Sequence, residues 1–497
     1  MQSVINVHTG KSAAKIDDRL YSSFIEHMGR AVCTGIYEPS HPSADPDGFR
    51  QDTAELIRPL ALSHIRYPGG NFLSGYDWKD GIGSKSLRPT RPELAWSALE
   101  PNKVGTDEFL QWCEQLGVSP MLGVNLGTGT PQSAAELVEY VNGTLPTYYS
   151  NLRRKNGHEE PYNVKLWCLG NEMDGPWQIC AKTAEEYGSI ACSTAKMMKW
   201  LDPSIELVAC GSSYRDMPTF GAWEREVLKH CYSDIDYLSL HQYYQNLDGD
   251  VPSFLSRSID MGEFIDEVAG ICREAKQVYG GGHDVFLSFD EWNVWYHFQK
   301  DCTEPPKWTF PRPIEEELYD MADALLVGCM LNTLINHADV VKIACMAQLV
   351  NTIAPIMTEP AGRAWVQTTY YPFLYASRFG RGDALHMEVS SPEYPCAIRE
   401  KVPYVDCAAV RDESGNISLF LINRSIDEPL CCSISFDDDL TGRRVDWTTL
   451  CGCAPTAVNT ADSAPVVPQK QGGAAFTGDA LVLTLQPFSW NLVRLTI

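Results

Sequence analysis

The chain of 497 residues lacks long hydrophobic runs and an excess of basic charge. Its most apolar stretch, residues 325–357, is interrupted by Asn332, His337 and Lys342, and its first residues alternate in polarity, so we expect neither a membrane span nor an export signal. Lys and Arg number 40 against 64 Asp and Glu, a net charge of −24. Because that charge repels phosphate groups, we expect no nucleic acid and no membrane among the partners.

The sequence also lacks the short motifs of metal, disulfide and nucleotide sites. It has 17 cysteines, an odd number, and no CxxC pair, which excludes a zinc ribbon and argues against a disulfide framework. The cluster Cys431, Cys432, Cys451 and Cys453 contains adjacent residues, which point to opposite faces of a strand, so we interpret it as small buried side chains. HExxH is absent, and no GxGxxG follows the first strand. We predict a cytoplasmic protein with no metal and no cofactor.

What the chain does contain is an alternation of short apolar runs with helical patterns. Apolar residues make up 44% of the chain, enough for a large core. The predicted strands lie in residues 22–29, 64–70, 120–127, 165–172, 205–211, 235–244, 285–292 and 340–348, and the predicted helices between them in residues 52–60, 106–116, 131–141, 183–200, 223–230, 262–279 and 315–336. Eight strands with intervening helices indicate an α/β fold, the (β/α)8 TIM barrel.

Beyond about residue 380 the helical patterns stop. Short alternating runs separated by Gly, Asn, Asp and Pro continue to the end of the chain, which indicates an all-β domain, a sandwich. We expect three parts: residues 1–16 as an N-terminal strand that joins the sandwich, residues 17–380 as the catalytic barrel, and residues 381–497 as the C-terminal β-sandwich.

Two of the barrel strands end in a carboxylate. Residues 285–296 (VFLSFDEWNVWY) deliver Glu291, and residues 165–172 (KLWCLGNE) deliver Glu172, 291 − 172 = 119 positions earlier. Because the C-terminal strand ends of a barrel converge on one mouth, the two carboxyl groups are expected to meet, as glycoside hydrolysis requires. In a retaining mechanism Glu172 would be the acid/base, protonated at rest, and Glu291 the nucleophile.

Other strand ends supply polar and aromatic side chains suited to a sugar pocket. They are Glu26, His27, Arg66, Asn71, Asn125, Asn171, His241, Tyr243, Tyr244, Trp295 and Gln348. Plainer interpretations exist: Glu26 and Arg66 as a structural ion pair, His27 and His241 as core histidines, and the tryptophans as packing between helices and barrel.

Several long blocks are more specific than these positions. FIEHMGR, IRYPGGNFLSGYDWKDGIG, LAWSALE, WCLGNEMDGPWQI, SLHQYY, LSFDEWNVWYH and KIACMAQLVNTIAPIMTE resemble, in order, those of the intracellular α-L-arabinofuranosidases of glycoside hydrolase family 51. The resemblance implies a TIM barrel with the acid/base on strand four and the nucleophile on strand seven, a C-terminal jelly-roll sandwich, and a homohexamer.

Carried over by position, Glu172 matches the acid/base and Glu291 the nucleophile of that family. Residues that bind the arabinofuranosyl ring are matched by Glu26, Asn71, Asn171, Tyr243 and Gln348, with Arg66, His241 and Trp295 in supporting places. The expected function is exo-hydrolysis of terminal α-L-arabinofuranosyl residues from arabino- and arabinoxylo-oligosaccharides, in arabinan catabolism and hemicellulose degradation. The alternatives are a related barrel glycosidase with endoglucanase or xylosidase specificity, and a catalytically silent sugar-binding protein.

Overall fold

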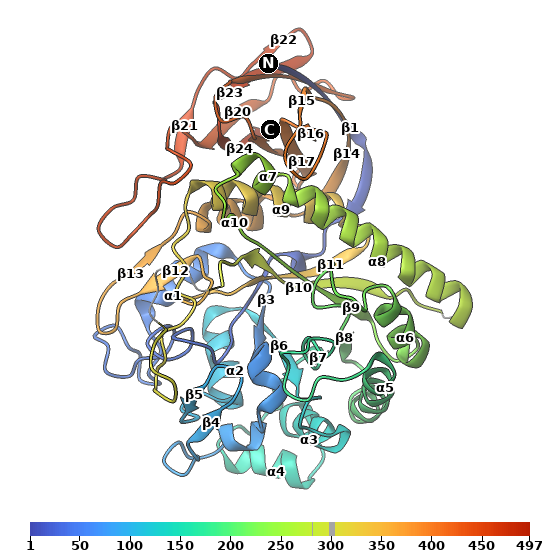
Figure 1. Ribbon diagram of the computed structural model, residues 1–497, viewed down its shortest axis with the longest axis vertical. Helices are drawn as coiled ribbons and strands as arrows, with labels where there is room; N and C mark the ends of the chain where they lie inside the picture. The colour runs from blue at the N-terminus through green and yellow to red at the C-terminus, as the bar shows by residue number, and fades with distance from the viewer. Residues whose placement is uncertain (281, 298–303) are drawn as a thin grey trace.

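The computed structural model describes residues 1–280, 282–297 and 304–497. Figure 1 shows a barrel surrounded by helices in the lower part of the view and a sheet-rich domain above it, where both chain termini lie. The barrel closes in the order β10-β11-β2-β3-β6-β7-β8-β9. Its strands are β2 (Ser22–Phe24), β3 (His64–Tyr67), β6 (Ser119–Val124), β7 (Leu166–Leu169), β8 (Glu206–Ala209), β9 (Tyr237–Tyr244), β10 (Phe286–Val294) and β11 (Val341–Ala347).

Each barrel strand overlaps a run predicted from the sequence, although β6 starts one residue earlier and β10 ends two residues later than its run. The TIM-barrel prediction is confirmed. Strand β7 shows why such runs are apolar throughout. Leu166 and Cys168 join the cluster inside the barrel, whereas Trp167 and Leu169 belong to the core between the barrel and its helices. Because alternate residues of a strand face opposite sides and both sides are covered, every position must be apolar.

The helices cover the outside of the barrel and its junction with the upper domain (Figure 1). They are α1 (Gln51–Ile57), α2 (Thr106–Leu116), α3 (Pro131–Asn142), α4 (Tyr148–Lys155), α5 (Ala184–Leu201), α6 (Ala222–Cys231), α7 (Val251–Leu255), α8 (Arg257–Tyr279), α9 (Met321–Asn336) and α10 (Tyr370–Phe379), with 3-10 turns η1 (Asp18–Leu20), η2 (Arg58–Leu60), η3 (Asn71–Gly75) and η4 (Trp78–Gly81). The sequence patterns did not predict α4, α7 or α10.

One predicted helix starts too early. The pattern placed it at residues 315–336, but α9 begins at Met321, so the first turns of that prediction are wrong. Glu315 has φ of 54°, which a right-handed helix excludes. Asp320 instead caps α9: its carboxylate accepts the Asp323 N–H, and the Asp323 carboxylate accepts the Asp320 N–H. This reciprocal pair of bonds satisfies two amides that helix geometry leaves free.

The upper domain is built on one ten-stranded sheet in the order β21-β20-β24-β18-β17-β14-β1-β19-β23-β22. Its strands are β1 (Gln2–Lys15), β14 (Asp383–Ser390), β17 (Val405–Arg411), β18 (Ile417–Asn423), β19 (Leu430–Phe436), β20 (Arg444–Leu450), β21 (Gln469–Gln471), β22 (Ala475–Thr477), β23 (Ala480–Leu485) and β24 (Ser489–Thr496). Strand β1 lies between β14, to which it is antiparallel, and β19, to which it is parallel. Side chains from β1, β18, β19 and β23 share one core, so the sheet folds over on itself and the all-β prediction is confirmed.

Three two-stranded ribbons complete the described chain. They are β4 (Arg91–Glu93) with β5 (Ala98–Glu100), β12 (Ile356–Thr358) with β13 (Ala364–Val366), and β15 (Glu393–Tyr394) with β16 (Val402–Pro403). The β4–β5 ribbon matters for function because the loop between its strands reaches the barrel mouth, as described below.

The junction between barrel and sheet is a continuous apolar layer. In β18, Leu419 and Leu421 face the core of the upper domain, whereas Phe420 and Ile422 belong to the barrel's core. Helix α9 is buried from Met321 to Ile335, which explains its apolar character on every face. The sheet therefore packs against α9 through its outer surface.

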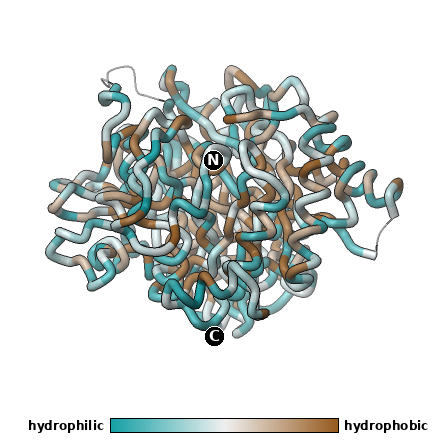
Figure 2. Tube along the Cα trace, turned by 90° about the horizontal axis from the view of Figure 1, so that it is seen from below, coloured by the Kyte–Doolittle hydropathy of each residue, from teal (hydrophilic) through white to brown (hydrophobic). Residues whose placement is uncertain are grey.

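Hydrophobic stretches are short throughout the trace and alternate with hydrophilic ones (Figure 2). Among the helices of the described residues, none combines the length and the apolarity that a bilayer crossing requires.

The close approach of α9 to the sheet predicts an unusual response to a Gly→Ala change. A Cβ on Gly328 would lie 2.6 Å from Cδ1 of Trp490 and 3.0 Å from Cδ1 of Ile422, both buried. Gly328→Ala should therefore destabilise the protein by about 1–3 kcal/mol through overpacking, although alanine favours helices. Thermal unfolding of the variant and the wild type measures this.

Gly270→Ala in α8 is the matched control, because the nearest atom to its added Cβ is 3.9 Å away, on the flexible Arg273. This change should be neutral or stabilising by up to about 1 kcal/mol. Equal melting temperatures for Gly328→Ala and wild type would contradict the packing described for the junction.

Candidate active site

The C-terminal strand ends surround a cavity of about 590 Å³, a size common for small-molecule sites. Of the residues predicted from the sequence, Glu26, Asn71, Glu172, Tyr243, Glu291, Trp295 and Gln348 line it. Arg66, Asn171 and His241 lie behind the lining and bind residues that form it. The structure thus brings these ten of the predicted side chains to one place.

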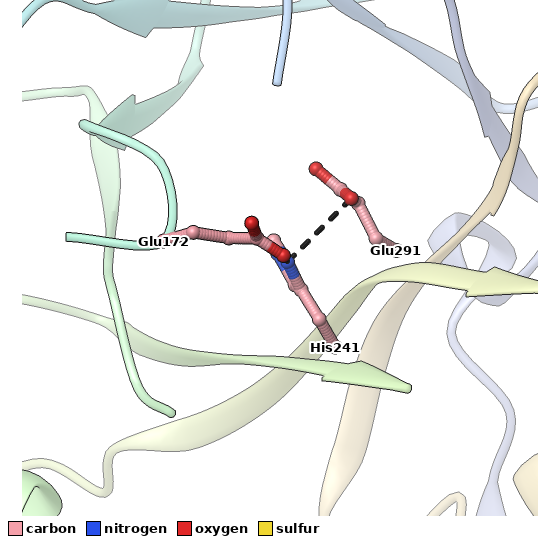
Figure 3. A group of neighbouring side chains, drawn as sticks. All are labelled: Glu172, His241 and Glu291. Atoms are coloured by element: carbon pink, nitrogen blue, oxygen red, sulfur yellow. Dashed lines mark hydrogen bonds and ion pairs between the residues drawn. The ribbon is translucent and has the colours of Figure 1, made fainter. Parts of the chain in front are cut away.

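The two predicted carboxylates meet at His241. Its Nδ1 lies 2.9 Å from Oε1 of Glu172 and 3.6 Å from Oε2 of Glu291 (Figure 3). One carboxylate oxygen of each Glu and one nitrogen of His241 all lie within 4.8 Å of one another. Such a close carboxyl pair fits a retaining glycosidase, in which the two groups are about 5–5.5 Å apart, rather than an inverting one, which needs room for a water molecule.

The turn after β7 directs Glu172 into the cavity. Gly170 has φ of 87° and Glu172 has φ of 45°, so two residues within three positions have a backbone conformation with positive φ. A non-glycine residue in this region costs free energy that the surrounding structure must offset, a pattern concentrated at functional sites. Glu172 is then held by His241 on Oε1 and by the indole N–H of Trp177 on Oε2, at 2.7 Å.

Glu291 is held by two hydrogen bonds. Arg66 donates from Nη1 to Oε1 at 2.6 Å, and the Tyr243 hydroxyl donates to Oε2 at 2.8 Å. The second guanidinium nitrogen, Nη2, donates to Oδ1 of Asn171 at 2.6 Å. Burial alone would lower the pKa of Arg66, but the charges of Asp290 and Glu291 raise it well above its usual value. Arg66 therefore pairs with the β10 carboxylates, and the structural ion pair with Glu26 considered from the sequence is wrong.

His241 is a buried cation. Burial alone would lower its pKa, but the negative charge of Glu291 and the contacts with Asp290 and Glu172 raise it to about 10. Glu172, His241 and Glu291 are spaced as metal ligands could be. A protonated imidazole has no lone pair to give a metal, and Arg66 already neutralises Glu291. The arrangement favours acid–base chemistry over metal binding.

Glu26 lines the cavity just beyond the end of β2. Its Oε1 accepts the Phe72 N–H at 2.9 Å and the Trp96 indole N–H at 3.0 Å, and its own N–H donates to Gln348 at 2.9 Å. Burial raises the pKa of Glu26 to about 8, more than these hydrogen bonds lower it. A Cβ on Gly70 would lie 2.5 Å from Oε2 of Glu26, so glycine is required there.

Aromatic side chains form the rest of the wall. The ring of Tyr243 packs edge-on against Trp295, with centroids 5.0 Å apart, and the indole of Trp295 donates to Glu315 at 2.9 Å. Beside Glu172, Trp177 stacks on Tyr214 and is 43% exposed. Such surfaces suit the apolar faces of sugar rings.

Some strand-end residues considered from the sequence do not line this cavity. His27 is bound between Glu100 at 2.8 Å and Tyr67 at 2.7 Å, which makes it the satisfied core histidine that we considered. Asn125 binds the Tyr76 carbonyl, and Tyr244 binds Asp260. These hydrogen bonds connect the strand ends to neighbouring elements and do not reach the cavity.

The sequence patterns missed Trp96 and Tyr214 as wall residues. Trp96 lies in the loop between β4 and β5, which no strand-end rule addresses. Its placement depends on distant segments: Arg312 donates to its carbonyl at 2.6 Å, and Trp308 donates to the Ser97 carbonyl at 2.6 Å. The only local sign of a wall residue at Trp96 was its aromatic side chain, because no barrel strand ends near it in the sequence.

Comparisons with known proteins agree with this geometry. A model of the α-L-arabinofuranosidase 1 domain matches residues 56–252, and one of the α-L-arabinofuranosidase C-terminal domain matches residues 290–489. The chain is 49% identical to an intracellular exo-α-(1→5)-L-arabinofuranosidase of Bacillus subtilis, over 97% of this chain and 96% of the relative. It is 42% identical to an exo-α-(1→6)-L-arabinofuranosidase of Bifidobacterium longum, over 99% and 97%.

Solved structures give the same picture. A family 51 α-L-arabinofuranosidase from Bifidobacterium longum superposes with a TM-score of 0.94 at 40% identity, over 99% of each chain. An arabinose complex of the Thermotoga maritima α-L-arabinofuranosidase gives 0.88 at 32% identity, over 100% of each. A bifunctional glucanase-xylanase gives 0.62 at 13% identity, over 100% of this chain and 99% of that one, and shares only the fold.

The raised pKa of Glu26 predicts a pH-dependent stability. Its pKa in the folded protein, about 8, exceeds the ordinary value of 4.5. Between these pH values the folded state holds a proton that the unfolded state releases. The contribution of this carboxyl group to stability is therefore lost as the pH rises from 4.5 to 8. Glu26→Gln keeps an oxygen acceptor but cannot ionise. Its melting temperature should fall less between pH 5 and pH 8 than that of the wild type.

Glu55→Gln, on the exposed surface of α1, serves as the control and should follow the wild type at both pH values. If Glu26→Gln loses as much melting temperature as the wild type across this range, Glu26 is already ionised in the folded protein at pH 5.

Proposed function

The chain belongs to the α-L-arabinofuranosidases of glycoside hydrolase family 51, and on that premise we propose how its site works. It is a retaining exo-glycosidase that releases terminal, non-reducing α-L-arabinofuranosyl residues from arabino- and arabinoxylo-oligosaccharides. The observation that supports the residue roles best is the close pair of Glu172 and Glu291 at the barrel mouth, with oxygens within 4.8 Å.

In the first step Glu291 attacks the anomeric carbon while Glu172 gives its proton to the glycosidic oxygen. The sugar passes through an oxocarbenium-like transition state and becomes an ester of Glu291. Arg66 and Tyr243 hold the two oxygens of Glu291, so the attacking group has one orientation before substrate arrives. This preorganisation removes the reorientation that a free carboxylate would need.

In the second step Glu172, now ionised, takes a proton from water, which attacks the glycosyl ester from the face that the leaving group vacated. Two inversions restore the original configuration. His241, donating to Glu172 at 2.9 Å, favours the anionic form that this step requires.

We assign the remaining wall to recognition of the arabinofuranosyl ring. Glu26 presents a carboxyl group, Asn71 and Gln348 present amides, and Trp295 presents an apolar face. Asn171 adds an amide from behind the lining, where it binds Asn71. The loop that carries Trp96 is tied to residues 308–312, which walls the cavity on the Glu26 side. A pocket closed on one side accepts a chain end, as exo-cleavage requires.

The rival functions have less support. The support for endoglucanase or xylosidase activity is a structural similarity to a glucanase-xylanase that is 13% identical to this chain. Similarity at that level of identity indicates a shared fold and not a shared activity. A silent sugar-binding protein would not need two carboxylates held by Arg66, Tyr243 and His241.

Several finer assignments are also part of the proposal. We place the domain limits at residues 1–16, 17–380 and 381–497, supported by the pairing of β1 with β14 and β19. The names of relatives support an intracellular, cytoplasmic location. We further propose a homohexamer acting in arabinan catabolism and hemicellulose degradation.

Loss of the proposed nucleophile gives the first functional test. Glu291→Ala should lose several orders of magnitude in turnover of 4-nitrophenyl α-L-arabinofuranoside, which the wild type hydrolyses. Added azide should fill the space of the carboxylate and give the glycosyl azide of inverted configuration. Product NMR distinguishes the two anomers, and Glu55→Ala, which should keep full activity, controls for the loss of a carboxylate.

Wild-type protein that cleaves a glucoside or xyloside but not the arabinofuranoside would overturn the substrate assignment alone. A fully active Glu291→Ala variant would overturn the mechanism.

Loss of the proposed acid/base should have a different signature. Glu172→Ala should retain much of its rate of glycosyl-enzyme formation with 4-nitrophenyl arabinofuranoside, because 4-nitrophenolate leaves without a proton, but lose natural oligosaccharide hydrolysis. Azide should then give the glycosyl azide of retained configuration, because the ester of Glu291 forms first. Burst kinetics and product NMR measure both effects; an inverted azide would contradict the assignment.

A further inference from the structure

Asp290, directly before the proposed nucleophile, has no part in the mechanism above. It is 1% exposed and its side chain lies beneath the cavity lining. Its Oδ2 lies 3.4 Å from Nε of Arg66, its Oδ1 lies 3.6 Å from Nε2 of His241, and Oδ1 also accepts the Ser239 hydroxyl. Asp290 therefore contacts both cations of the site.

These contacts keep Asp290 ionised. Burial alone would raise its pKa, but the charge of Arg66, the contact with His241 and the Ser239 hydrogen bond lower it below its usual value. Among the residues that the structure describes, the other titratable groups that face Asp290 are the thiols of Cys168, Cys210 and Cys345, whose pKa values burial raises. The thiols are neutral, so the charges that matter around Asp290 are those of Arg66, His241 and Glu291.

The charges of this buried group balance in a specific way. Arg66 and His241 carry two positive charges, and Asp290 and Glu291 carry two negative ones. We propose that Asp290 is a positioning residue whose charge balances Arg66 and His241, so that Glu172 faces a neutral group and keeps its proton. This inference rests on the proposed roles of Glu172 and Glu291.

Removal of the Asp290 charge should leave the group with one net positive charge. A nearby positive charge favours the ionised form of a carboxyl group, so Glu172 would lose its proton at lower pH. The resting enzyme would then lack the acid that the first step needs. The same excess of positive charge would also make Glu291 easier to ionise. The acidic limb of the pH profile of kcat/KM reports that change.

The experiment is the pH dependence of kcat/KM of the full-length enzyme with an oligosaccharide substrate that needs acid assistance. Asp290→Asn, nearly isosteric, should move the alkaline limb to lower pH by about one unit or more. His241→Gln removes a positive charge instead and should move the same limb to higher pH. Opposite directions identify an electrostatic role, because a disturbed fold would not reverse sign between the two variants.

Asp406→Asn is the matched control. Asp406 pairs with Arg424 at 2.6 Å and accepts from Asn332 at 2.7 Å, at the junction of α9 with the sheet and outside the cavity lining. Like Asp290→Asn, this variant removes the charge of a largely buried carboxylate that is paired with an arginine. It therefore shows the effect of general destabilisation on the pH profile. Its pH profile should match that of the wild type even if its melting temperature falls.

An Asp290→Asn profile that coincides with the wild-type profile, or that moves to higher pH, overturns this inference. Asp290→Ser carries the same expectation if the Asn variant does not fold, and the direction found for His241→Gln remains a test in either case. Failure of the proposed function is seen separately, as an inactive wild type or an active Glu291→Ala.

Discussion

The buried ion pair between Arg66 and Glu291 is the interaction on which the site depends. Arg66 is 1% exposed and lies 2.6 Å from the carboxylate, and neither charge would be stable there without the other. The guanidinium also fixes Asn171, the residue before Glu172. One arginine on β3 therefore sets the positions of a group on β10 and of a group in the turn after β7, and the closure of the barrel brings these segments within its reach.

The site concentrates features that oppose stability. Glu172 has a left-handed backbone conformation, and Glu26 is buried at a pKa of about 8. Such features persist only where the surrounding structure holds them in place. The barrel provides that rigidity through side chains packed on both faces of its strands, and the upper domain adds to it through the apolar layer around α9.

The upper domain is also tied to the barrel along the chain. Strand β1 precedes the barrel in sequence yet lies in the middle of the ten-stranded sheet, between two strands that follow the barrel. The two ends of the chain thus meet in one sheet (Figure 1). The paired residues lie from 383 − 15 = 368 to 431 − 2 = 429 positions apart. This pairing explains why an alternating, isolated N-terminal stretch is a stable strand.

The sequence by itself determined the barrel, the all-β domain and the candidate carboxylate pair. Strands buried on both faces are short, continuous apolar runs that can be recognised locally, and the rule that their C-terminal ends converge places Glu172 and Glu291 together. Tertiary structure alone decided that Arg66 pairs with Glu291 and not with Glu26, that α9 begins at Met321, and that Trp96 walls the cavity. Those outcomes depend on which distant side chains come within about 3–4 Å, the range of hydrogen bonds and salt bridges, and residue order does not encode those distances.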